Sequence, residues 1–179
     1  MTAGESTGED PRDGEGRPTG TPGISLVPEP TAGEEVQAQL EEFDVGEAIV
    51  GIVMGSESDM EQMQKAADEL DKRGIPNEVR VMSAHRQPDL VAEYAKSARA
   101  RGLRVIIAGA GISAALPGAV AAHTEIPVIG VPLSGRLSAA GGLDAILSIV
   151  QMPPGVPVAC VGLDNARNAA VLAARILGA

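Results

Sequence analysis

Aromatic side chains are almost absent from this sequence. Its 179 residues include no Trp, one Tyr (Tyr94) and one Phe (Phe43), although 44% of the residues are hydrophobic. Nucleic-acid bases and flavin rings are commonly held by stacking on aromatic side chains, and the sequence has no basic stripe either. We therefore expect no nucleic-acid partner and no flavin, and a core built from Val, Ile, Leu, Ala and Met.

Cysteine and long apolar runs are equally scarce. Cys160 is the single cysteine, which excludes a disulfide within the chain and is typical of a protein of the reducing cytoplasm. It lies in the apolar run VPVACVGL, where a free cysteine is usually a small core residue rather than a nucleophile. No run of about 18 apolar residues occurs, so we expect no membrane span.

The formal net charge of −10 is concentrated in the N-terminal part of the chain. Residues 1–44 hold eleven acidic residues and two arginines, a net charge of −9, whereas residues 45–179 are nearly neutral at −1. The first segment is rich in Gly, Pro and Thr, a composition typical of disorder. We expect residues 1–44 to be a disordered acidic leader, in which residues 34–43 could form a short helix, and residues 45–179 to form a single folded domain.

From residue 48 onward, apolar runs that suit buried parallel strands alternate with segments of helical period. The expected strands are 48–55, 77–84, 103–111, 126–133 and 156–163, and the expected helices are 58–74, 87–102, 113–123, 142–150 and 165–177. This alternation predicts an α/β fold, a three-layer αβα sandwich around a parallel sheet. We expect the flavodoxin-like strand order 2-1-3-4-5, with ligands bound at the carboxyl ends of the strands.

The loop after the first expected strand reads MGSESDM and allows two interpretations. The hydroxyls of Ser56 and Ser58, with backbone N–H groups at a helix start, form an anion site in the first, and Asp59 accepts hydrogen bonds from ribose hydroxyls. In the second, these residues only cap the helix.

The loop after the second expected strand reads SAHRQP. Arg86 can bind a phosphate through its planar guanidinium, and His85 can donate and accept a proton near neutral pH. The alternative is an exposed His-Arg pair without function at a helix start. Because this loop reaches the same edge of the sheet as the first, the functional interpretation is favoured.

The loop after the third expected strand, AGAGISAALPG, lets a flat ligand approach the backbone closely. It matches neither the dinucleotide-binding pattern nor the phosphate loop of nucleoside triphosphatases. No His or carboxylate pair has the spacing of metal ligands, and His123, at the opposite end of a helix, is expected on the surface. We expect no cofactor and no metal.

Six segments carry a resemblance to a known family. In chain order they are GIVMGSESD, VMSAHRQP, IIAGAGISAALPG, PVIGVP, LDAILSIVQMPPGVPV and NAAVLAARIL. Together they resemble the PurE family of purine biosynthesis over about residues 50–177. The resemblance implies a mutase that moves the carboxylate of N5-carboxyaminoimidazole ribonucleotide to C4 of the ring without a cofactor. It also implies a small-molecule ribonucleotide as substrate and a homo-octamer.

The resemblance implies a role for each matching residue. His85 resembles the general acid and base, and the substrate-binding residues are Ser56, Asp59, Ser83 and Arg86, with Ser83 near the phosphate. The third loop would contact the ring and the released carbon dioxide through Gly109, Gly111, Ser113 and Ala115.

The chain departs from the family pattern at Ala115. The usual mutases carry a histidine just before LPG, where this sequence has Ala115. Direct carboxylases, which add carbon dioxide to aminoimidazole ribonucleotide, also lack that histidine, as do some members otherwise like mutases. SAHR and SIVQMPPGVPV favour the mutase, direct carboxylation is the alternative, and an inactive ribonucleotide-binding paralogue is the non-enzymatic alternative.

Overall fold

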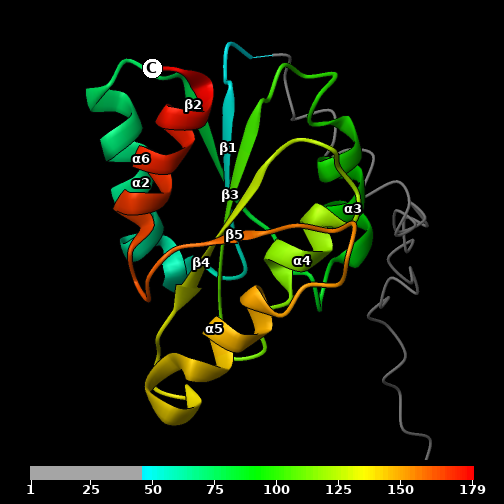
Figure 1. Cartoon of the computed structure of the whole chain (residues 1–179), viewed down its shortest axis with the longest axis vertical. Coiled ribbons are helices and arrows are strands. Elements are labelled where there is room, and N and C mark those ends of the chain that lie inside the picture. The colour runs from blue at the N-terminus through cyan, green and yellow to red at the C-terminus, as the bar shows by residue number, and fades with distance from the viewer. Residues whose placement is uncertain (1–45) are drawn as a thin grey trace, which may run out of the picture. The chain divides into compact units, whose positions relative to one another are not determined.

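The structure, a computed structural model, describes residues 46–179 (Figure 1). The short helix considered over residues 34–43 lies outside the described part of the chain. The strands are β1 (Val50–Met54), β2 (Asn77–Val81), β3 (Val105–Gly111), β4 (Val128–Leu133) and β5 (Ala159–Cys160). The helices are α2 (Met60–Lys72), α3 (Pro88–Ser97), α4 (Leu116–Ala121), α5 (Leu143–Val150) and α6 (Ala166–Leu177), with 3₁₀ turns η1 (Glu57–Asp59) and η2 (Ala139–Gly142).

The five strands form one parallel sheet in the order β2-β1-β3-β4-β5, which confirms the flavodoxin-like prediction. At its centre, Ile52 of β1 lies opposite Val79 of β2 on one side and Ile107 of β3 on the other. Because all strands run the same way, their carboxyl ends meet at one edge of the sheet. The four loops that follow β1 to β4 are thereby brought together.

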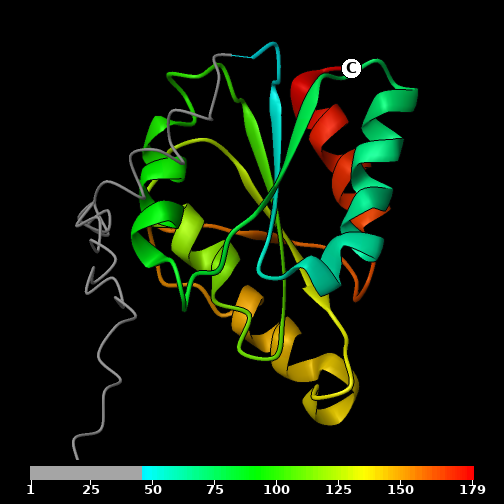
Figure 2. The same cartoon turned by 180° about the vertical axis from the view of Figure 1, so that it is seen from behind.

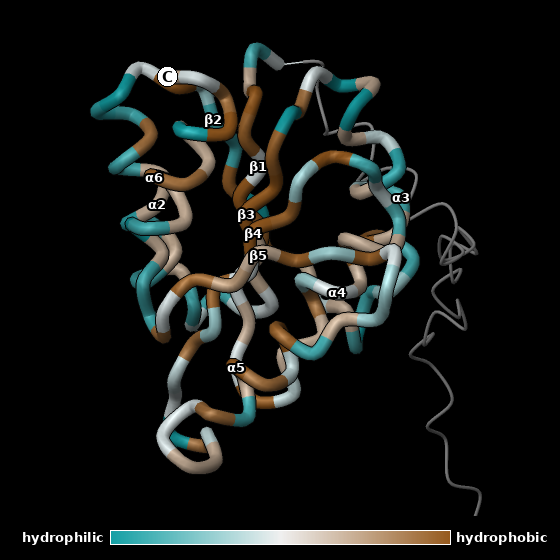
Figure 3. Tube along the Cα trace, in the orientation of Figure 1, coloured by the Kyte–Doolittle hydropathy of each residue, from teal (hydrophilic) through white to brown (hydrophobic). Residues whose placement is uncertain are grey.

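Helices cover both faces of the sheet, so the molecule has the expected three layers (Figures 1 and 2). α2 and α6 pack side by side on one face, and α3, α4 and α5 lie on the other. Successive strand residues point to opposite faces: Ile52 belongs to the apolar cluster under α2 and α6, whereas Val53 belongs to the cluster under α3, α4 and α5. Figure 3 shows the hydrophobic strands at the centre, between helices in which hydrophilic and hydrophobic residues alternate.

Small residues compensate for the missing aromatic side chains. The buried face of α6 consists of alanines: Ala166, Ala169, Ala170, Ala173 and Ala174. Side chains of this size let α6 lie close to α2 and to the sheet, so that a dense core forms without large rings. None of the helices described between residues 46 and 179 is long and apolar enough to cross a membrane.

The fifth strand is much shorter than the apolar run VPVACVGL predicts. β5 pairs with β4 through Ala159 and Cys160. Pro157, two residues before β5, has no N–H to donate to a ladder. Within residues 46–179, β5 is the edge strand on this side of the sheet. Cys160, expected in the core, is half-buried at its margin. That partial burial raises the pKa of its thiol, and a thiol is a weaker nucleophile than a thiolate.

Candidate active site

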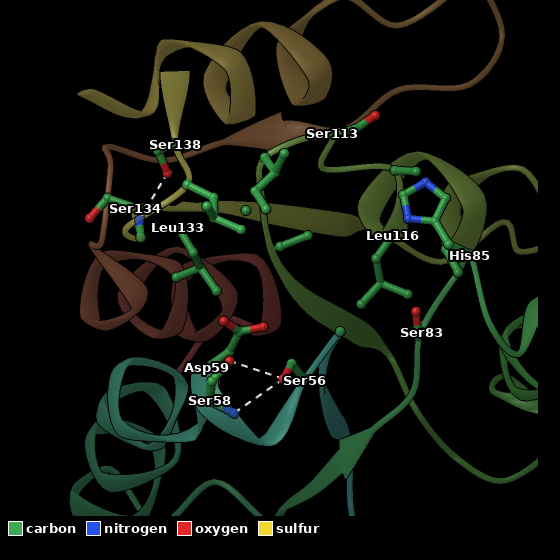
Figure 4. Close-up of a pocket in the computed structure, with 18 of the residues that line it drawn as sticks. Ser56, Ser58, Asp59, Ser83, His85, Ser113, Leu116, Leu133, Ser134 and Ser138 are labelled. Carbon is green, nitrogen blue, oxygen red and sulfur yellow. Dashed lines mark hydrogen bonds between the residues drawn. The ribbon is translucent and has the colours of Figure 1, made fainter. Parts of the chain in front are cut away.

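A cavity of about 750 Å³ opens at the carboxyl edge of the sheet (Figure 4). It is lined by residues of four loops, which lie within 55–59, 83–86, 110–116 and 133–138. These loops follow β1, β2, β3 and β4 respectively. The predicted convergence of the first three loops is confirmed, and the fourth loop joins them although it was not predicted to.

In the first loop, Ser56 both caps a helical turn and lines the cavity. Its Oγ accepts the backbone N–H of Ser58 at 3.3 Å and lies 2.9 Å from the Ser58 Oγ. The capping interpretation is therefore correct, yet both hydroxyls remain at the cavity wall. The turn that they open, η1, has acidic residues at Glu57 and Asp59, which oppose an anion there. Hydroxyl groups, more than a helix terminus, make this wall suitable for a phosphoribosyl group.

Asp59 is the one carboxylate that lines the cavity among residues 46–179. Burial raises the pKa of its carboxyl group, and a hydrogen bond from the Ser56 backbone opposes that rise. A half-buried carboxylate gains from accepting hydroxyl hydrogen bonds. This environment fits the predicted contact with ribose.

The second loop is a tight turn that presents His85 and Arg86 to solvent. Gln87 donates its backbone N–H to the Ser83 carbonyl at 2.8 Å, so residues between them project outward. Ser83 itself is 8% exposed. The Arg86 Nη2 donates to the Gly55 carbonyl at 3.0 Å and so ties the second loop to the first.

That bond leaves Arg86 able to bind a ligand. A guanidinium has five N–H donors, and the Gly55 carbonyl accepts from one of its nitrogens. Arg86 lines the cavity together with Ser56, Ser58 and Ser83. All of the predicted substrate-binding residues and the predicted catalytic residue therefore line one cavity.

The third loop is compact and strained. Ile112 has φ = 57°, a conformation unusual for a β-branched residue. The backbone N–H of Ala114 donates to the Ile112 carbonyl at 3.0 Å, and that of Ala115 donates to the Ser113 carbonyl at 2.7 Å. Strain of this kind persists where surrounding structure over-determines it, commonly at functional sites. α4 begins only after this turn, at Leu116, rather than at residue 113 as expected.

Two glycines of the third strand have different roles. A Cβ on Gly111 would lie 2.8 Å from the Leu133 carbonyl oxygen, so the close approach of β3 to β4 at the cavity depends on glycine. Gly109, predicted to contact the ring, does not line the cavity. It lies within β3, where a Cβ would overlap the side chain of Met63. Gly109 is a packing residue, whereas Gly111, Ser113 and Ala115 line the cavity as predicted.

The fourth loop contributes Leu133 and residues 134–138 to the wall. Its sequence SGRLS contains two hydroxyls and a cation, Arg136. The prediction covered the loops after the first three strands, although the rule that places ligands at the carboxyl ends of strands applies equally to the fourth. Figure 4 shows Ser134 and Ser138 across the cavity from Ser83 and His85.

Other reactive groups lie away from the cavity. His123 is exposed after α4, as predicted, and does not line the cavity, and neither does Cys160. His85 is thus the one imidazole at the cavity wall. Among residues 46–179, no group of three His, Cys, Asp or Glu side chains is placed to hold a metal ion.

Comparison with known proteins identifies the family. A family model described as AIR carboxylase matches residues 49–179. The N5-carboxyaminoimidazole ribonucleotide mutase of Pyrococcus horikoshii is 57% identical over 130 residues, 73% of this chain and 72% of that protein. The phosphoribosylaminoimidazole carboxylase of Schizosaccharomyces pombe is 57% identical over 129 residues, 72% of this chain but 23% of that longer protein. The crystal structure of Treponema denticola PurE matches with a TM-score of 0.64 and 37% identity, over 72% of this chain and 79% of that one. The chain belongs to the AIR carboxylase family.

Proposed function

We propose that this chain converts N5-carboxyaminoimidazole ribonucleotide into 4-carboxy-5-aminoimidazole ribonucleotide, a mutase reaction of purine biosynthesis. The observation that carries the proposal is the placement of His85 beside Arg86 at a cavity lined by three serine hydroxyls of the first two loops. Curated relatives of this name are 57% identical over most of the chain.

The first two loops suit the phosphoribosyl group. Arg86 supplies a planar cation for the phosphate, with hydroxyl donors from Ser56, Ser58 and Ser83 around it. Asp59 accepts hydrogen bonds from ribose hydroxyls. With the phosphate held, the imidazole ring of the substrate is fixed relative to His85, which lies in the same loop as Arg86.

His85 can perform both proton transfers of the reaction. The bond between N5 and the carboxylate carbon breaks, carbon dioxide is released, and protonated His85 delivers its proton to N5. C4 then attacks the carbon dioxide, and His85 removes the proton from C4 as the ring regains its aromaticity. The histidine returns to its starting state, so the net change is an isomerisation that one acid-base group can serve.

The third loop is placed to retain the carbon dioxide between these steps. Gly111, Ser113 and Ala115 form a wall of small groups, which lets the released molecule stay beside C4. Confinement raises its effective concentration at the carbon that it must reach. A rigid, tightly bonded turn serves this role better than a mobile one.

Direct carboxylation of aminoimidazole ribonucleotide is the second candidate. It is favoured by Ala115, which lines the cavity where the usual mutases have a histidine, and by the carboxylases that are related to this chain at similar identity. In this reaction carbon dioxide enters from solution and the proton from C4 still passes to His85. The same residues would serve both reactions, so turnover must decide between them.

We also propose that the protein works in the cytoplasm as a homo-oligomer, an octamer as the family resemblance implies. Support for assembly comes from α5, where Leu143, Leu147 and Val150 are each 46–47% exposed along one side of the helix. Three large apolar side chains on a single face are typical of an interface. Mass measurement of the native protein tests the number of copies.

A paired turnover assay tests the reaction. One sample receives N5-carboxyaminoimidazole ribonucleotide, and the other receives aminoimidazole ribonucleotide with varied bicarbonate. Efficient conversion of the first, with the second requiring very high bicarbonate, supports the mutase. Efficient conversion of the second at modest bicarbonate supports the carboxylase, and binding without turnover of either substrate would identify an inactive paralogue.

A further inference from the structure

The loop that follows β4 is held in place by a residue outside the cavity. Asp164 lies between β5 and α6, and its carboxylate accepts two hydrogen bonds from Ser134, one from the backbone N–H at 2.8 Å and one from the hydroxyl. The Asp164 N–H in turn donates to the Pro132 carbonyl at 2.9 Å. Hydrogen bonds to an ionised acceptor are stronger than neutral ones, so Asp164 fixes the first residue of the loop.

The backbone of Asp164 has an unusual conformation that suits this contact. Its φ is 55°, in the left-handed region, which Asp and Asn tolerate better than other residues with a side chain. Such a conformation is maintained where the contacts that it permits outweigh its cost. Here those contacts are the three hydrogen bonds that join Asp164 to Pro132 and Ser134.

The rest of the loop closes on itself beside the cavity. Gly135 donates its N–H to the Ser138 Oγ at 2.8 Å, and Ser138 donates its N–H to the Gly135 carbonyl at 3.0 Å. Arg136 and Leu137 lie at the tip of this closed turn, and both line the cavity. Because the turn is rigid and its first residue is fixed by Asp164, the position of Arg136 depends on Asp164.

Among residues 46–179, Arg86 and Arg136 are the two arginines that line the cavity, one on the second loop and the other on the fourth. Their loops follow β4 and β2, which are separated in the sheet by β1 and β3. Three strand spacings place the starts of these loops about 14 Å apart. Arg136 forms no ion pair with a carboxylate within residues 46–179, unlike Arg73, Arg99 and Arg167.

We propose that Arg136 binds the carboxylate of the substrate and product, and that Asp164 is the positioning residue that holds Arg136 for this contact. Arg86 and the serines of the first two loops occupy the phosphate end, so the second cation is left for the second anionic group of the ligand. This inference rests on the proposed function, because only a carboxylated ribonucleotide carries an anion at each end.

Calorimetric titration with two nucleotides tests the assignment. 4-Carboxy-5-aminoimidazole ribonucleotide carries phosphate and carboxylate, whereas aminoimidazole ribonucleotide carries the phosphate alone. We expect Arg136→Ala to weaken binding of the carboxylated nucleotide about tenfold, the lower end of the value for a charge-assisted contact, and to leave binding of the other unchanged. Arg99→Ala, which removes an exposed arginine outside the cavity, is the matched control and should alter neither.

Variants of Asp164 test the positioning role. Asp164→Gly retains the left-handed backbone but removes both acceptors, and should reproduce the selective loss of Arg136→Ala. Asp164→Asn tolerates the same backbone and retains one acceptor, so it should restore part of the affinity for the carboxylated nucleotide. The double variant Arg136→Ala/Asp164→Gly should bind no more weakly than Arg136→Ala, because both changes remove the same contact.

Each other outcome overturns a defined part of the proposal. Equal weakening of both nucleotides by Arg136→Ala would place Arg136 at the phosphate, and no weakening of either would remove it from the site. A selective effect of Arg136→Ala without one from Asp164→Gly would refute the positioning role. If the wild-type protein binds neither nucleotide and turns over neither substrate, the proposed function itself fails, which is a different result from any of these.

Discussion

Replacing Glu78 by Gln should destabilise the fold by a predictable amount. The Glu78 carboxylate accepts hydrogen bonds from the Tyr94 hydroxyl at 2.8 Å and from two Arg101 nitrogens, Nη2 at 2.7 Å and Nη1 at 3.2 Å. The Arg101 guanidinium also lies 4.8 Å from the centroid of the Tyr94 ring, within range of a cation–π interaction. Glutamine retains the shape of Glu78, but its N–H₂ group would face the donors of Tyr94 and Arg101, to which it cannot bond.

The burial of the pair sets the magnitude. The side chains of Arg101 and Glu78 are 9% and 14% exposed. Exposed ion pairs contribute about 0–1 kcal/mol, whereas breaking a fully buried pair costs about 3–5 kcal/mol. A pair at the margin of the core lies between these limits, so we expect Glu78→Gln to lower the free energy of unfolding by about 2–3 kcal/mol.

Urea unfolding at a fixed protomer concentration measures this loss, and the chain offers a matched control. Glu93 forms an ion pair with Lys96 on the surface of α3, with side chains 44% and 55% exposed. Glu93→Gln removes the same charge from an exposed pair and should cost at most about 0.5 kcal/mol. If both variants lose the same stability, burial does not set the strength of the Glu78 pair and the reasoning is refuted.

The pH dependence gives a second test with a defined sign. Burial alone would raise the pKa of Glu78, but hydrogen bonds from Arg101 and Tyr94 and the nearby cations lower it below the ordinary value. A lowered carboxyl pKa means that the folded state binds the proton less tightly than the unfolded chain. The stability difference between wild type and Glu78→Gln should therefore be complete above about pH 4.3 and shrink as the pH falls through the folded pKa.

Tyr94 reports on the same cluster without interference, because it is the single Tyr and the chain has no Trp. Burial, then the charge and hydrogen bond of Glu78, raise the pKa of Tyr94 above its usual value. Tyrosinate absorbance should consequently appear only well above pH 10 in the wild-type protein, and at lower pH in Glu78→Gln. An unchanged alkaline midpoint in the variant would contradict the contact between these two side chains.

Three predictions concern the cavity. His85→Asn should lower turnover about 10²–10⁴-fold, the usual contribution of a general acid-base group, while ribonucleotide binding measured by titration stays largely intact; equal loss of both would refute the proton-transfer role. Arg86→Ala should weaken binding of both carboxylated and uncarboxylated nucleotides by about 1.5–3 kcal/mol, because a charge-assisted contact to their common phosphate is lost; unchanged affinity would place the phosphate elsewhere. Asp59→Asn should raise the thermal midpoint at neutral pH slightly, because burial raises the pKa of this carboxyl group and so disfavours its charged form. The same change should weaken nucleotide binding. A lower thermal midpoint would mean that the charge of Asp59 stabilises the empty protein.

The central sheet and the first two loops of the site could be predicted from the sequence because their signals are local. The apolar run that contains Ile52 is too continuous for a half-exposed strand, and strict alternation with helices makes the strands parallel. Parallel strands place their carboxyl ends at one edge, so SAHRQP and MGSESDM had to meet there. The bond between Arg86 and the Gly55 carbonyl confirms that they do.

Other features depend on contacts between distant residues and had no local signal. The short β5 pairs with β4 through two residues at the edge of the sheet. The different roles of Gly109 and Gly111 depend on Met63 and on the Leu133 carbonyl, respectively, which lie on other elements. The contact of Asp164 with Ser134 spans 30 residues and is visible only in three dimensions.

The turn that carries His85 and Arg86 determines where these neighbouring side chains lie at the cavity. A backbone hydrogen bond of 2.8 Å between Gln87 and Ser83 closes the turn, and Ser83 is buried. Both ends of the turn are therefore fixed. Arg86 is fixed again by the Gly55 carbonyl, which leaves His85 as the freely exposed member of the pair. A phosphate bound at Arg86 therefore sets the distance from the substrate ring to His85 through two covalently adjacent residues. This arrangement gives the proton-transfer group a defined position at the cavity wall.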